Sequence, residues 1–185
     1  VAEAGTTQLQ IIQVSGDGKT MSIVGQALLN GGEAKGIFVN SSATRAYIVT
    51  SASSTQKEFF IVDVSTKTEN RPTIGSYEAN GMNPKGVTAV PGNRAIIVGT
   101  GGEEYQVINI SDETNPTSCG GLNIDTGVNG VSSVIEQDGD VYSYIITRDS
   151  SSEFKIIEGG PGGQFATSGT FTSNYFDAGA TVAYN

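Results

Sequence analysis

Short apolar segments recur along the chain at a nearly constant spacing. Four of them share one pattern, in which β-branched and aromatic residues surround a polar position: LQIIQVS from Leu9, FFIVDVS from Phe59, YQVINIS from Tyr105 and FKIIEGG from Phe154. Their first residues are separated by 50, 46 and 49 residues. A fixed period of this length is typical of repeat architectures, in which each repeat is one supersecondary unit.

Three further sequence features recur with the same spacing of nearly 50 residues. They are Val24-Gly25, Ile74-Gly75 and Cys119-Gly120; a glycine before an apolar residue at Gly36, Gly86 and Gly130; and the segments RAYIVT, RAIIVG and YSYIIT from Arg45, Arg94 and Tyr142. All these segments are short, rich in β-branched and aromatic residues, and bounded by Gly, Pro, Asn or Ser. They are therefore predicted to be β-strands.

The predicted strands are joined by segments with turn chemistry. Pro91-Gly92-Asn93 links two of them as a hairpin, and Asp138-Gly139-Asp140 and Ser41 to Thr44 occupy the equivalent places in the other repeats. Four strands in every ~40–50 residues are the signature of a β-propeller blade. The fold class is therefore predicted to be all-β, a β-propeller of four-stranded antiparallel blades with four blades in the ring.

We expect residues 1–185 to form one propeller domain with repeat units at about 21–65, 73–111 and 118–158. The terminal segments 9–15 and 164–185 would then complete one blade between them. Residues 174–185 lack the glycine markers of the other repeats, so the alternative is that they start a further module.

Composition excludes several kinds of chemistry. The 185 residues include 19 Asp and Glu against 10 Lys and Arg, no His and a single Cys, and the net charge is -9. Imidazole catalysis, a Cys/His zinc site and an intrachain disulfide are excluded. The acidic balance argues against nucleic acid as a partner, and no apolar stretch is long enough to span a membrane. Cys119 is expected to be a small buried apolar residue.

A family resemblance rests on the two middle repeats. FFIVDVS is followed by Asn70-Arg71-Pro72 and Ile74-Gly75-Ser76-Tyr77, and YQVINIS is followed by Asn115-Pro116. Over roughly residues 9 to 160 the chain resembles LVIVD-repeat proteins. The resemblance implies a β-propeller in a bacterial protein that is secreted or attached to the cell surface, without an assigned activity and without catalytic residues to transfer.

One polar residue interrupts each apolar repeat segment. The four equivalent positions are Gln13, Asp63, Asn109 and Glu158. Gln13 and Glu158 depart from the LVIVD pattern, which favours Asp or Asn at this position. Apolar neighbours on both sides predict that these strands are packed on both faces, so an unpaired polar group would cost ~1–3 kcal/mol. We expect these side chains to hydrogen-bond to neighbouring strands and turns.

The candidate ligand-binding residues lie at the opposite end of the predicted blades. An acid precedes an aromatic residue in three repeats, at Glu58, Glu104 and Glu153, and repeat symmetry predicts that these carboxylates share one face. The loops on that face also present Lys35, Lys85 and Asn129. Such a polar cluster is able to hold a cation or a glycan; alternatively, these residues are ordinary solvated strand ends, with lysines pairing with acids at ~0–1 kcal/mol each.

No catalytic residue, metal site or cofactor is predicted. Calcium is a weaker alternative, since Asp138-Gly139-Asp140 and Asp112-Glu113 supply oxygen ligands. Neither segment has the spacing of a known calcium loop, and Asp and Gly are favoured in turns on conformational grounds alone.

The sequence predicts a non-enzymatic interaction or adhesion module of a secreted or cell-surface protein. A monomeric propeller would bind a partner protein or a glycan through its loop face. The alternatives are a carbohydrate-active hydrolase that uses Asp/Glu pairs near the central channel, and a structural spacer in a larger surface protein.

Overall fold

The computed structural model describes residues 7–137 and 139–159. Within these ranges it contains fourteen β-strands and no helix. Their bounds are β1 Leu9–Val14, β2 Met21–Ala27, β3 Ala34–Val39, β4 Arg45–Thr50, β5 Phe59–Asp63, β6 Glu69–Asn70, β7 Thr73–Tyr77, β8 Asn83–Val90, β9 Arg94–Thr100, β10 Tyr105–Asn109, β11 Thr117–Leu122, β12 Val128–Ile135, β13 Val141–Thr147 and β14 Phe154–Gly159. The all-β prediction is confirmed, and no described segment is a helix able to cross a membrane.

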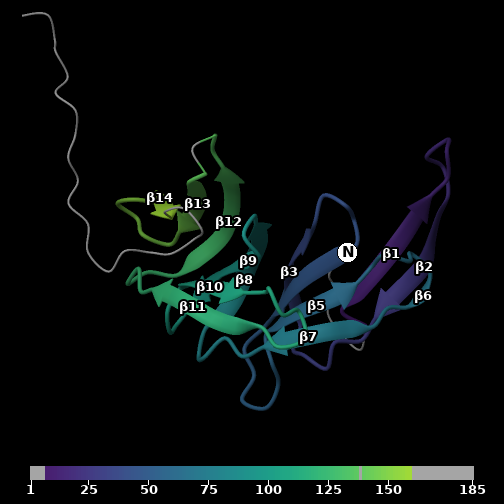
Figure 1. Cartoon of the computed structure of the whole chain (residues 1–185), viewed down its shortest axis with the longest axis horizontal. Coiled ribbons are helices and arrows are strands. Elements are labelled where there is room, and N and C mark those ends of the chain that lie inside the picture. The colour runs from purple at the N-terminus through teal and green to yellow at the C-terminus, as the bar shows by residue number, and fades with distance from the viewer. Residues whose placement is uncertain (1–6, 138, 160–185) are drawn as a thin grey trace, which may run out of the picture.

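The strands form four sheets in chain order (Figure 1). The second and third sheets, β3-β4-β5-β7 and β8-β9-β10-β11, are four-stranded and antiparallel throughout. The first sheet is β1-β2 with the two-residue β6 added in parallel, and the fourth is β12-β13-β14. Every strand that is predicted within the described residues is present, and these sheets have the predicted organisation of propeller blades.

Each predicted repeat unit spans two sheets. The units 21–65, 73–111 and 118–158 each contain the outermost antiparallel strand of one sheet and the three inner strands of the next. The chain therefore crosses from one sheet to the next within every unit. The segment 164–185, which is expected to complete the first blade, lies outside the described residues.

Three apolar layers lie between the four sheets. Leu9 and Ile11 of the first sheet pack on Ile48 and Phe60 of the second. The opposite face of the second sheet packs on the third, and the third packs on the fourth in the same way. The second and third sheets are thus buried on both faces, which explains why their strands are continuous apolar runs.

The innermost strands β3, β8 and β12 pack side by side. A Cβ on Gly36 would lie 3.2 Å from the Cα of Gly86, and a Cβ on Gly86 would lie 3.4 Å from the Cα of Gly130. The recurrent glycines therefore form a row in which neighbouring backbones approach closely. A larger side chain in this row would push the inner strands apart.

The outer faces of the two end sheets are exposed. Ile12 and Val14 of β1 are 39% and 50% exposed, so the prediction that this strand is packed on both faces is wrong. Phe154 and Ile156 of β14 are similarly exposed, at 56% and 55%. Among the described residues, no sheet covers these faces.

The predicted turn chemistry is confirmed where the structure describes it. Gly92 and Asn93 have φ values of +83° and +57° between β8 and β9, in the left-handed region that these residues tolerate. In the equivalent β3–β4 turn, the Asn40 side chain accepts hydrogen bonds from the amides of Thr44 and Arg45. Cys119 is exposed on the outermost strand β11, so its predicted burial is wrong.

We expect Gly75→Ala to lower the free energy of unfolding by about 1–3 kcal/mol, the usual cost of overpacking. A Cβ at this position in β7 would overlap the carbonyl oxygen of Glu113 in the next sheet. Gly16→Ala is the matched control, because a Cβ there meets nothing within 4 Å. Urea unfolding of both variants tests this, and equal stabilities would contradict it.

Candidate functional site

The candidate residues lie at the end of the sheets where the second strand of each blade turns into the third. The connections β4–β5, β9–β10 and β13–β14 are here, and so are the connections that enter β3, β8 and β12. We call this end of the molecule the loop face. The predicted grouping of these connections is therefore present in the structure.

Two of the three predicted carboxylates are buried hydrogen-bond acceptors. Glu58 is 1% exposed and accepts from the amide of Ser53 (3.0 Å) and the amide of Ala79 (3.0 Å). Glu104 is 8% exposed and accepts from the amide of Ile124 (2.9 Å). Glu153 is exposed. Glu58 and Glu104 thus hold the crossover from one sheet to the next, and they do not form an open cluster with Glu153.

A fourth member of this set was not predicted. Gln8, directly before β1, accepts from the amide of Leu29 through its Oε1 (2.9 Å). The spacing from acceptor to donor is nearly the same as for Glu58 and Ala79 and for Glu104 and Ile124. Its position one residue before a recurrent apolar segment is the sequence signal, although Gln8 carries an amide where Glu58 and Glu104 carry a carboxylate.

Glu58 also contacts a second carboxyl group. Burial, and then a hydrogen bond and charge repulsion from Glu58, raise the pKa of Glu78 above its ordinary value of 4.5. A protonated Glu78 is able to donate to the Glu58 carboxylate, whereas an ionised Glu78 would be repelled by it. Glu58 and Glu78 are thus a carboxyl pair in contact, and Glu58 is buried within it.

The other three candidates occupy equivalent β-bulges on the innermost strands. The register between β3 and β4 shifts between Ala34 and Gly36, which leaves Lys35 without a partner in the ladder. The same shift leaves out Lys85 of β8 and Asn129 of β12. We call Lys35, Lys85 and Asn129 the bulge row. Bulges redirect side chains and are common beside binding sites.

The members of the bulge row differ in their surroundings. Lys35 donates to the Glu33 carboxylate (2.6 Å) in an ion pair at the surface. Lys85 is half-buried and Asn129 is exposed. Each precedes a glycine of the close-packed row, so the three positions are held in line by the inner strands.

Residues next to the bulge row anchor the longest loop on this face. Asn83, the first residue of β8 in the third sheet, accepts from the amide of Ala52, which follows β4 of the second sheet (3.1 Å). The amides of Thr55 and Gln56 donate to the Ser53 hydroxyl, both at 3.2 Å. Together with Glu58, these bonds hold the exposed loop that joins β4 and β5 in a defined conformation.

Three of the four polar residues within the third strands are hydrogen-bonded as predicted, and Gln13 is the exception. Asp63 accepts from the amide and hydroxyl of Ser65, which lower the pKa of its carboxyl group. Asn109 accepts from the amide of Ser111 and from Arg94. Glu158 accepts from the hydroxyl of Tyr142 (3.1 Å). Gln13 is exposed on β1.

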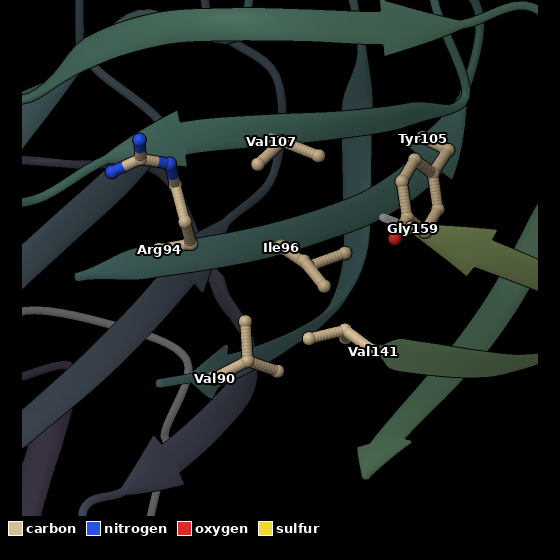
Figure 2. Close-up of a pocket in the computed structure, with 7 residues that line it drawn as sticks. All are labelled: Val90, Arg94, Ile96, Tyr105, Val107, Val141 and Gly159. Atoms are coloured by element: carbon tan, nitrogen blue, oxygen red, sulfur yellow. The ribbon is translucent and has the colours of Figure 1, made fainter. Parts of the chain in front are cut away.

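Two equivalent arginines lie near these positions. The Nε of Arg45 donates to the Glu113 carboxylate (2.7 Å) in the next sheet, and this bond raises the pKa of Arg45. The Nε of Arg94 is buried without a hydrogen-bond partner among the described residues. It lies beside a small cavity of about 10 Å³, shown in Figure 2 with Val141 and Gly159 of the fourth sheet.

The predicted calcium segments show turn chemistry where they are described. The Asp112 carboxylate accepts from the amide (3.0 Å) and hydroxyl (2.6 Å) of Thr114 within its own turn. Asp138 lies outside the described residues. Across residues 7–137 and 139–159, no three His, Cys, Asp or Glu side chains are grouped so that they could hold a metal ion.

The fold is similar to that of solved β-propeller proteins. A protein of Bacteroides fragilis provisionally described as a 6-phosphogluconolactonase matches with a TM-score of 0.62 and 11% identity, over 86% of this chain and 54% of that one. The periplasmic gluconolactonase of Pseudomonas aeruginosa matches with a TM-score of 0.55 and 7% identity, over 86% and 50%. A luciferin-regenerating enzyme matches with a TM-score of 0.50 and 14% identity, over 84% and 54%.

These matches establish the fold and leave the activity open. This chain spans about half the length of the propellers it matches. Neither a family model nor a curated protein matches its sequence. The propeller prediction is therefore confirmed at the level of fold, and the LVIVD resemblance stays a prediction.

We expect Glu58→Ala to lower the free energy of unfolding by about 1–3 kcal/mol, because two amides lose their acceptor. Glu58→Gln should lower the free energy of unfolding by less, since the side-chain oxygen of Gln8 is the acceptor at the equivalent position. Urea unfolding tests both, with Glu136→Ala as a control at an exposed acid. A Glu58→Ala variant as stable as this control would contradict the assigned role.

The Glu78 pair predicts a pH dependence of stability. A carboxyl group whose pKa is higher in the folded state contributes stability that is lost as the pH rises from its unfolded pKa through its folded pKa. Glu78→Gln keeps a hydrogen-bond donor without the charge. We therefore expect the variant to gain stability relative to the wild type between pH 4 and pH 7. Urea unfolding of both proteins at several pH values tests this. A stability difference between Glu78→Gln and the wild type that stays constant over this pH range would contradict the coupling.

Proposed function

We propose that this chain is a non-enzymatic interaction or adhesion module of a secreted or cell-surface protein. It engages a partner protein or a glycan through the loop face. The observation that carries this proposal is the bulge row, where Lys35, Lys85 and Asn129 lie at equivalent positions on three adjacent inner strands. The LVIVD resemblance of the middle repeats supports the extracellular setting.

The chemistry of the bulge row suits oxygen-rich ligands. Lysine ammonium groups and an asparagine amide donate hydrogen bonds to hydroxyl, carbonyl and carboxylate oxygens. The anchored loop between Ser51 and Glu58 adds exposed hydroxyl and amide groups beside them. Because this loop is already ordered, binding to it costs little conformational entropy.

A hydrolase remains the alternative in a different class. One observation bears on it: Glu78, with its raised pKa, is hydrogen-bonded to Glu58 at the loop face, so a protonated acid and a carboxylate lie together, but glycoside hydrolysis needs its two carboxyl groups about 5 Å or more apart. The burial of Glu58 argues against it, because a substrate has to reach both carboxyl groups. A spacer role in a larger surface protein predicts no ligand at all.

A binding and turnover screen separates these alternatives. The protein is tested on an array of neutral and acidic glycans, and every ligand found is incubated further and assayed for released reducing sugar. We expect saturable binding that weakens at least tenfold in Lys85→Ala/Asn129→Ala. Lys19→Ala/Gln13→Ala, which removes one lysine and one amide from the exposed first sheet, should bind like the wild type.

The outcomes against the proposal are specific. Unchanged affinity in the bulge-row variant would show that the ligand does not bind at the bulge row. Released sugar that depends on Glu78 would favour the hydrolase. An empty array would leave a protein partner, which cross-linking on intact cells with the same pair of variants would test; cross-linking that the bulge-row variant does not reduce would reject the proposal.

A further inference from the structure

The outer face of the fourth sheet repeats a face that is buried in the second sheet. Four side chains form it, two from the middle strand and two from the strand that follows. In the fourth sheet they are Tyr144, Ile146, Phe154 and Ile156. In the second sheet the equivalent residues are Tyr47, Val49, Phe59 and Ile61. Both registers place the tyrosine opposite an isoleucine and the phenylalanine opposite a β-branched residue.

The aromatic pair within this face has the same geometry in both sheets. The rings of Tyr47 and Phe59 are stacked, with their centroids 6.3 Å apart and an interplanar angle of 13°. The rings of Tyr144 and Phe154 are also stacked, at 6.1 Å and 23°. The fourth sheet thus presents the same surface that the second sheet uses for a contact between sheets.

The two faces differ in what covers them. The third sheet covers the face of the second, whose four residues are at most 5% exposed. In the fourth sheet, Ile146, Phe154 and Ile156 are 55%, 56% and 55% exposed, and no described sheet covers them. A contiguous apolar face on a protein surface marks an interaction site.

The first sheet exposes the matching half of this contact. In the third sheet, Ile108 and Ile110 belong to the cluster that covers the face of the second sheet, and they are 0% and 6% exposed. Their equivalents in the repeated segment of the first sheet are Ile12 and Val14, which are 39% and 50% exposed. The molecule therefore carries both halves of one internal contact, one on each of its end sheets.

These two halves lie at opposite ends of the molecule, with the second and third sheets between them (Figure 1). The solved propellers of similar fold match 86% of this chain within 54% and 50% of their own length. The four sheets therefore follow about half of such a ring, and two copies supply the length of a whole one. A head-to-tail contact forms a closed ring where the rotation between subunits allows it.

We propose that two copies of this chain form one closed ring, in place of the expected monomer. The outer face of the fourth sheet of each copy packs on the outer face of the first sheet of the other, so that Phe154 and Ile156 cover Ile12 and Val14 of the second copy. Rotation about the ring axis keeps both loop faces on the same side. The bulge rows of the two copies then surround one channel.

Sedimentation equilibrium of the full chain over a range of concentrations tests this assembly. We expect the mass of two chains of 19.1 kDa. Ile156→Asp and Val14→Asp each bury an unpaired charge in the contact and should raise the Kd of the dimer about a hundredfold. Leu28→Asp is the matched control, because Leu28 is 58% exposed in the connection between β2 and β3, outside both end faces. It should dimerise like the wild type.

An equal mixture of the two interface variants provides a second measurement. In the mixed dimer, the intact fourth sheet of Val14→Asp meets the intact first sheet of Ile156→Asp, so one of the two contacts is unchanged. We therefore expect the mixture to dimerise at least tenfold more tightly than either variant alone. A dimer formed through two fourth sheets predicts instead that Val14→Asp behaves like the wild type and that mixing gives no gain.

Four results would overturn the proposal. They are a wild type that stays monomeric, an assembly larger than two chains, unchanged dimerisation of Val14→Asp, and a mixture no tighter than its components. A monomeric wild type would show that this chain itself or another protein covers the end faces. Far-UV circular dichroism checks that each variant is folded, and Ile156→Ser and Val14→Ser carry the same test where an aspartate variant does not fold.

Discussion

Burial of both faces of each sheet is the constraint on which the rest of this structure depends. A sheet of short strands does not bury enough apolar surface by itself, so each sheet here is stable only against its neighbours. The second sheet shows this directly: Ile48 faces the first sheet and Val49 faces the third, and both are completely buried. The glycine row on the inner strands follows from this packing, because adjacent sheets have to converge at one edge.

The same constraint decides which polar groups are free to bind a ligand. Crossing from one sheet to the next leaves backbone amides in a buried region, and those amides need acceptors. Gln8, Glu58 and Glu104 supply them, so these side chains are committed to the fold. The bulge row is different, because its residues fall outside the ladder and accept none of these amides.

The strands were predictable from the sequence, whereas the side-chain environments were not. Spacing and turn chemistry located the described strands of the repeats, because apolar periodicity and glycine turns act locally, whereas the two-residue β6 was not predicted. Exposure is set by the neighbouring sheet, which the pattern does not reveal: Phe59 is buried and Phe154 is 56% exposed, although both start the same repeat segment. The burial of Glu58 was missed for a related reason, since its partner Ala79 lies 21 residues away across a crossover.

Repetition itself therefore needs a careful interpretation in this kind of fold. An acid that recurs at the same place in successive repeats predicts a symmetric binding site. The structure shows a simpler cause, because each of the three described crossovers contains a backbone amide that needs this acceptor. A residue that recurs with the repeat thus serves the repeat, as Glu58 and Glu104 do. Ligand binding is better sought at equivalent positions that fall outside the ladder and accept no crossover amide, and on the loop face Lys35, Lys85 and Asn129 meet that condition.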